Sequence, residues 1–168
     1  ILCSKDLYLV SWGLDDNFFM YCEEVDRQWR SRLYGYTIGK TNDVYIYHAG
    51  AWSSSWERLN YTTFLRRNQN TPQMLIKNYR RWNLFRVLPC YMCINIIEVF
   101  VFLFIWKWKI AYSYLQGRWY VVSSLRWSII PKRKSIQAKR IISDYEIMKH
   151  MYHWSAKIHH LCSYLQKK

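Results

Sequence analysis

The first 60 residues contain short apolar stretches separated by polar turn residues. A turn signal at residues 13–17 precedes the acidic run 23–26, which opens a helical pattern. Acidic side chains are favoured at a helix start, Asp26 and Arg30 can pair four positions apart, and Gly35 suits a helix end. The pattern predicts a helix from Glu23 to Leu33.

A strand signal follows this predicted helix. Residues 43–47 read DVYIY and are rich in β-branched and aromatic side chains. His48 stands at the end of this segment, and a loop of small residues follows at 49–55. Because loops at strand ends often carry functional groups, His48 is a candidate site residue, although a structural histidine explains the pattern as well.

The rest of the chain has helical patterns. Residues 59–86 combine basic and apolar positions, with a break expected at Pro72. Residues 87–106 form the most apolar stretch, about as long as a bilayer-spanning helix. Glu98 falls inside it, and a charge at that depth is costly, so a span and an in-plane helix are both open. Amphipathic basic helices are expected over residues 116–168, with a break near Pro131.

Charge separates the front of the chain from the rear. Residues 1–60 carry six basic and eight acidic side chains, residues 61–106 carry six and one, and residues 107–168 carry thirteen and two. The net charges are therefore −2, +5 and +11. A basic rear half predicts contact with an anionic surface, either nucleic acid or anionic lipid. Aromatic residues beside Lys107 and Lys109 resemble an interfacial membrane anchor.

The cysteines give little support to a metal or disulfide framework. Five are present, an odd number, and Cys90 and Cys93 form one CxxC inside the apolar stretch without a second pair. Reduced thiols are the simpler interpretation. The four histidines near the C-terminus, from His150 onward, fit an exposed basic helix better than a metal site.

Several segments together resemble family 2 glycosyltransferases, especially rhamnosyltransferase-like members. Residues 13–21, GLDDNFFMY, are similar to the G-[FL]-D-E-x-F-F-M-Y segment of that family, and residues 22–30, CEEVDRQWR, to F-E-D-V-D-L-x-x-R. Residues 33–36 match L-x-G-Y, and residues 44–50 fit a strand end with V-x-H-x-G. Weaker similarities continue through RN at 67–68, KNY at 77–79 and the basic tail.

The resemblance implies an α/β fold. Residues 1–60 would be the C-terminal part of a GT-A, Rossmann-like catalytic domain, and residues 61–168 a helical, basic, membrane-associated extension that includes the apolar segment 87–106. The nucleotide-binding half and the Asp-x-Asp motif of such enzymes have no counterpart in the sequence. We therefore expect a truncated portion that has no transferase activity alone.

The resemblance also assigns chemistry to the acidic run. An inverting transfer needs a carboxylate that removes the proton of the acceptor hydroxyl. Position in the motif gives this role to Glu24, where the family usually has Asp, with Glu23 and Asp26 as alternatives. A purely structural acidic helix start that pairs with Arg30 is the competing interpretation. His48 would ligate a divalent metal, Mg or Mn, in the full-length enzyme.

The implied partners are a nucleotide-sugar donor, a lipid-linked or glycan acceptor and an anionic membrane surface, at the cytoplasmic face of the cell membrane. Synthesis of cell-surface polysaccharide is the corresponding process. Two other functions remain open: a basic nucleic-acid-binding protein and a non-catalytic membrane scaffold. We expect no nucleic acid as partner, because the basic residues flank an apolar run and no recognised nucleic-acid-binding motif is present.

Overall fold

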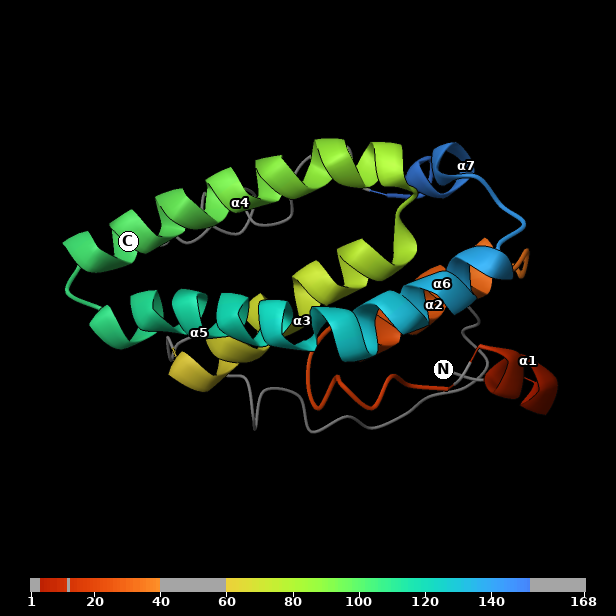
Figure 1. Ribbon diagram of the computed structural model, residues 1–168, viewed down its shortest axis with the longest axis horizontal. Helices are drawn as coiled ribbons and strands as arrows, with labels where there is room; N and C mark the ends of the chain where they lie inside the picture. Colours follow the sequence, from red (N-terminus) through yellow and green to blue (C-terminus); the bar gives the residue numbers. More distant parts are fainter. Residues whose placement is uncertain (1–3, 12, 40–59, 152–168) are drawn as a thin grey trace.

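The computed structural model describes residues 4–11, 13–39 and 60–151. These residues form a helical fold (Figure 1) with seven α-helices and one π-helical turn. In chain order they are α1 (Lys5–Val10), α2 (Glu23–Leu33), α3 (Tyr61–Asn78), α4 (Arg81–Phe104), α5 (Trp108–Ser124), η1 (Leu125–Ile129), α6 (Ile130–Ala138) and α7 (Asp144–Met148). No strand occurs in the described residues.

The expected α/β, Rossmann-like fold is therefore wrong. The front of the described chain packs against helices, because α2 lies on α3 and α7 rather than on a sheet. Trp29 and Tyr79, from α2 and the end of α3, meet edge to face with ring centroids 4.7 Å apart. The strand predicted at 43–47, and His48 at its end, lie outside the described residues.

The predicted helix from Glu23 to Leu33 is confirmed as α2. Acidic side chains occupy its first turn and basic ones its last turn, which complements the helix dipole. Gly35 follows the helix with φ of +88°, a left-handed conformation in which glycine carries no steric penalty. Local sequence signals therefore determine both ends of this helix.

Helix α3 contradicts the break expected at Pro72, which lies inside it. A proline in a helix interior cannot donate to the carbonyl four residues earlier, here that of Asn68. Helix α5 packs against α3 at this position through Gly117. A Cβ placed on Gly117 would lie 2.7 Å from Asn68 Cβ and 3.1 Å from its carbonyl oxygen. Helix α3 thus continues through Pro72 and packs closely against α5.

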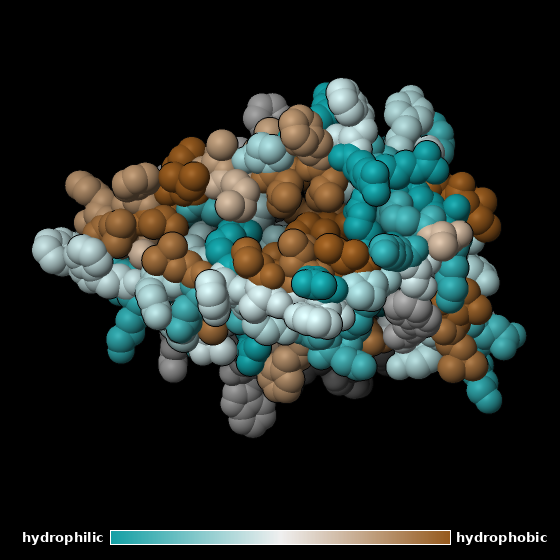
Figure 2. Space-filling model, viewed as in Figure 1, coloured by the Kyte–Doolittle hydropathy of each residue, from teal (hydrophilic) through white to brown (hydrophobic). Residues whose placement is uncertain are grey.

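Helices α4 and α5 form a long antiparallel hairpin that runs along one side of the molecule (Figure 1). Helix α5 is covered by α3 and α4, whereas α4 rests mainly on α5. Figure 2 shows that apolar side chains gather on this face of the molecule. Helix α4 is the one helix in the described ranges that is long and apolar enough to cross a bilayer, and 17% of its most apolar window is buried in the protein.

Helix α5 leads directly into η1 and α6, so residues 108–138 follow one helical path. Pro131 is the second residue of α6 and follows η1 directly. The expected break near Pro131 is thus a change of helix type in the preceding residues, not an interruption. The path joins the apolar hairpin to the part of the molecule that contains α2 (Figure 1).

One hydrophobic core connects both sides of residue 60. Its buried members come from the front segment and from the rear helices, and they are Phe18, Trp29, Leu33, Tyr34, Met74, Leu75, Tyr79, Tyr91, Ile136 and Ile147. The carbonyl of Leu33 accepts hydrogen bonds from the backbone N–H groups of Ile141 and Ile142. The described residues of the two predicted segments therefore pack together.

Candidate functional site

A turn with unusual backbone conformation precedes α2. Tyr21 and Cys22 have φ of 67° and 71°, values that residues with a Cβ seldom adopt. Two successive residues of this kind need support from their surroundings. Buried Asn70 of α3 supplies it, since its Nδ2 donates to the carbonyl oxygens of Met20, at 2.8 Å, and Tyr21, at 2.9 Å. Helix α3 thus fixes where α2 begins.

Further contacts hold the same turn. The Tyr21 hydroxyl lies 3.3 Å from Thr63 Oγ1, and the Cys22 sulfur lies 3.6 Å from Thr71 Oγ1. Burial raises the pKa of the Cys22 thiol above its ordinary value. The thiol is therefore protonated near neutral pH, and Cys22 serves the turn as a packed neutral group.

The three candidate acids occupy different environments. Glu24 is exposed on the first turn of α2, and Glu23 beside it is half-buried. One carboxylate oxygen of Glu23, Oε2, is buried without a hydrogen-bond partner. Asp26 is fully buried. A carboxylate that contacts a substrate must be accessible, so Glu24 has the suitable position, with Glu23 next to it.

Asp26 is bonded at both carboxylate oxygens. Its Oδ2 lies 2.9 Å from Arg30 Nε and 3.3 Å from Lys77 Nζ, and its Oδ1 accepts from Asn78 Nδ2 at 2.8 Å. The predicted pairing with Arg30 is thereby confirmed. The Arg30 guanidinium also donates to the backbone carbonyls of Ser11 and Gly13. Asp26 holds the front segment, α2 and α3 together.

Asp15 extends this network to the rear of the chain. Its carboxylate pairs with Lys77 of α3 and with Lys132 of α6, and it accepts a hydrogen bond from the Asn17 backbone N–H. Burial by itself would raise the pKa of Asp15, but the two lysines and the Asn17 N–H outweigh it and hold this pKa at about 2. Asp15 is therefore ionised throughout the neutral range.

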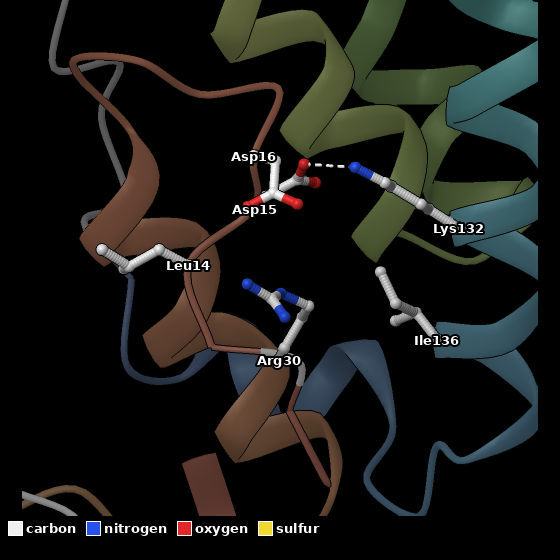
Figure 3. A pocket seen from close by; sticks show the side chains of 6 residues that line it. All are labelled: Leu14, Asp15, Asp16, Arg30, Lys132 and Ile136. Atoms are coloured by element: carbon white, nitrogen blue, oxygen red, sulfur yellow. Dashed lines mark hydrogen bonds and ion pairs between the residues drawn. The ribbon is translucent and has the colours of Figure 1, made fainter. Parts of the chain in front are cut away.

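A small open cavity of about 250 Å³ lies beside the network (Figure 3). It lies between the turn that contains Asp15 and the facing helix α6, and its lining residues are Leu14, Asp15, Asp16, Arg30, Lys132 and Ile136. Its basic side chains are already paired within the protein, Arg30 with Asp26 and Lys132 with Asp15, and the acid that lines it without such a pairing, Asp16, is exposed. The cavity is thus chiefly a gap beside a structural ion network.

Sequence reasoning assigned no role to Asp15, Lys77 or Lys132 in such a network. Lys77 and Lys132 stood only in weakly similar segments, and Asp15 stood in the turn segment 13–21 that resembles the family motif, without a role of its own. One local signal was available in the sequence, namely the many polar residues of the segment that forms α3. The structure buries several of them, among them Asn68, Asn70, Gln73, Lys77 and Asn78. Buried polar groups require partners, and that pattern indicates a polar interior.

Among the described residues, no group of three or more His, Cys, Asp or Glu side chains comes together that could hold a metal ion. The carboxylates that are close to one another, Asp15 and Asp26, already bind Lys77, whose positive charge would repel a metal ion. The expected ligand His48 lies outside the described residues, and so does any test of whether it faces Glu24.

No family model, no curated protein and no solved structure matches this chain.

Proposed function

We propose that the chain is part of an inverting glycosyltransferase that uses a nucleotide-sugar donor and a lipid-linked or glycan acceptor, with Glu24 as the base. The observation that supports this role is the exposure of Glu24 in the first turn of α2. The backbone turn directly before this helix is held by Asn70 of α3. A fixed, accessible carboxylate can accept the proton of an acceptor hydroxyl as the oxygen attacks the anomeric carbon.

The environments of the three acids favour Glu24 over its neighbours. Asp26 has both oxygens bonded to cationic or amide groups, so protonation of Asp26 would break the network that joins α2 to α3. Glu23 points one oxygen into a buried position. Glu24 alone among the three is exposed. In this assignment Asp26 stabilises the helix that carries the base.

The test uses the complete gene product that contains this chain and compares Glu24→Gln with the unchanged protein. Release of nucleoside diphosphate from a panel of nucleotide sugars is measured with membrane-extracted acceptor, and donor binding is measured by calorimetry. Removing the base should lower kcat on the order of a hundredfold or more and leave donor affinity unchanged. The defect then lies in proton removal rather than in donor recognition.

Glu146→Gln is the matched control, because Glu146 is also an exposed acid in the first turn of a helix. This variant should keep the activity of the unchanged protein. Full activity of Glu24→Gln would refute the assignment. Loss of activity in Glu23→Gln with full activity in Glu24→Gln would transfer the role of base to Glu23. Absence of turnover with every nucleotide sugar would argue against glycosyl transfer altogether.

A further inference from the structure

The polar side chains in the middle of α4 face its partner helix. Tyr91 and Asn95 are buried, with 8% and 4% of their surface exposed, although half of the residues of α4 are exposed. The Glu98 carboxylate accepts a hydrogen bond from the Tyr114 hydroxyl of α5 at 3.1 Å. The Arg118 guanidinium of α5 lies 5.0 Å from the centre of the Tyr91 ring. Positions 91, 95 and 98 thus form one stripe that is turned onto α5.

The other sides of α4 are apolar and exposed. The large apolar side chains that face solvent along α4 are Trp82, Phe85, Met92, Ile96, Ile97, Phe100 and Phe104. Figure 2 shows the apolar surface that results on this side of the molecule. In the middle of α4, polar groups face inward and large apolar groups face outward, the reverse of the usual pattern of a surface helix in water. Such a surface marks an interaction site of low polarity.

We propose that the α4–α5 hairpin lies in the plane of an anionic bilayer surface, with the outer side of α4 in the boundary between headgroups and acyl chains. Exposed basic residues along the hairpin supply the charge complementarity, and they are Arg81, Arg86, Lys107 and Lys109. Lipid headgroups attract such residues, while the apolar side chains enter the boundary region. A bilayer also fits the exposed tryptophans, which favour this boundary.

The distribution of tryptophan along the hairpin favours this orientation over a span. A spanning helix has its tryptophans near both interfaces. Here Trp82 lies at the start of α4, Trp106 and Trp108 at the turn, and Trp119 within α5, and all four are more than half exposed. Trp119 is about 16 Å along α5 from Trp108, at a rise of about 1.5 Å per residue. In a vertical hairpin it would fall near the middle of a hydrocarbon core of about 30 Å.

The first experiment measures flotation of the whole chain with phosphatidylcholine vesicles, with and without phosphatidylglycerol. We expect flotation with the anionic vesicles that high salt weakens but does not abolish, because screening affects the charges and not the apolar contact. Phe100→Glu should reduce the bound fraction about tenfold or more, since Phe100 is 66% exposed on α4. Ile141→Glu is the matched control and should float normally, because Ile141 is 74% exposed outside the hairpin.

The second experiment measures the depth of α4 in the bilayer and so tests its orientation by a readout other than the bound fraction. Positions 82, 93 and 100 lie on one stripe of α4, because they are separated by 11 and 7 residues, close to whole turns. A fluorophore on a single cysteine at each position, with the other cysteines replaced by serine, is quenched by lipids brominated at known depths. In-plane docking predicts equal, shallow depths at all three positions.

Two results would overturn the proposal. A depth at position 93 much greater than at 82 and 100 would show that α4 spans the bilayer. Failure of the chain to float, with a dimer in light scattering that Phe100→Glu dissociates, would assign the apolar face to a second copy of this chain. Neither experiment involves a sugar or Glu24, so both outcomes are independent of the proposed transferase activity.

Discussion

The backbone of α5 at Gly117 contacts α3 at Asn68, with an ideal Cβ on Gly117 only 2.9 Å from the Asn68 carbonyl carbon. Backbone atoms cannot move aside as the end of a flexible side chain can. The two helices would have to separate to accept any larger residue at position 117.

We predict that Gly117→Ala destabilises the protein by about 1 to 3 kcal/mol, the usual cost of forcing extra volume into a packed interface. The sign of this change in the free energy of unfolding is informative, because alanine stabilises a helix relative to glycine by about 1 kcal/mol when no contact opposes it. Urea unfolding followed by circular dichroism measures the free energy of unfolding. Gly39→Ala is the control, since a Cβ there meets nothing within 4 Å. Equal or greater stability of Gly117→Ala would contradict the close contact.

Removal of the Asp26 carboxylate should be far more costly than removal of an exposed acid. Asp26→Ala leaves Arg30 and Lys77 buried without their shared partner, and we expect a loss of about 3 to 5 kcal/mol. Glu146→Ala breaks an ion pair with Lys149 whose side chains are about half exposed, and it should cost less than about 1 kcal/mol. Chemical unfolding of both variants checks the difference. Similar losses of stability in Asp26→Ala and Glu146→Ala would contradict a buried ion network around Asp26.

The Asp15 carboxylate should contribute to acid sensitivity. Its pKa is held at about 2 in the folded protein, below the ordinary value of 3.8, so the folded form binds this proton less readily than the unfolded form. The stabilisation is present above pH 4 and is lost as the pH falls from about 4 to about 2; it is on the order of 2 kcal/mol.

Asp15→Asn should therefore be less stable than the unchanged protein at neutral pH. Its stability should also depend less on pH between about 4 and 2. Free energies of unfolding from urea titrations at several pH values measure both quantities, and Asp16→Asn, an exposed neighbour, serves as the control. Parallel pH profiles for Asp15→Asn and the unchanged chain would show that Asp15 does not titrate differently on folding.

Local signals in the sequence predicted α2 fully, because its acidic first turn, its basic last turn and Gly35 all specify the same boundaries. The pairing of Asp26 with Arg30 followed from their spacing of four. The break expected at Pro72 was wrong, since α3 runs from Tyr61 to Asn78 through this residue. The contact of Asn68 with Gly117, 49 positions away, is likewise not visible in the local pattern.

The candidate site was predicted only in part. The acidic run at 23–26 was recognised, but sequence alone ranked its members by motif position and not by exposure. The bonds of Asp26 and Asp15 to Lys77 join positions 51 and 62 residues apart, and no periodicity indicates them. The α/β expectation was wrong because it depended on a resemblance, and the described residues bury the front segment against helices.

The pairing of Asp15 with Lys132 also has a consequence for the order in which the chain folds during synthesis. The two residues are 117 positions apart, so translation at 5 to 20 residues per second separates them by on the order of ten seconds. The ion pair of Asp15 with Lys132 cannot form until the intervening helices have been synthesised. The apolar hairpin, at residues 81–124, leaves the ribosome before Lys132 does. A membrane can therefore receive the hairpin before the ion network is complete.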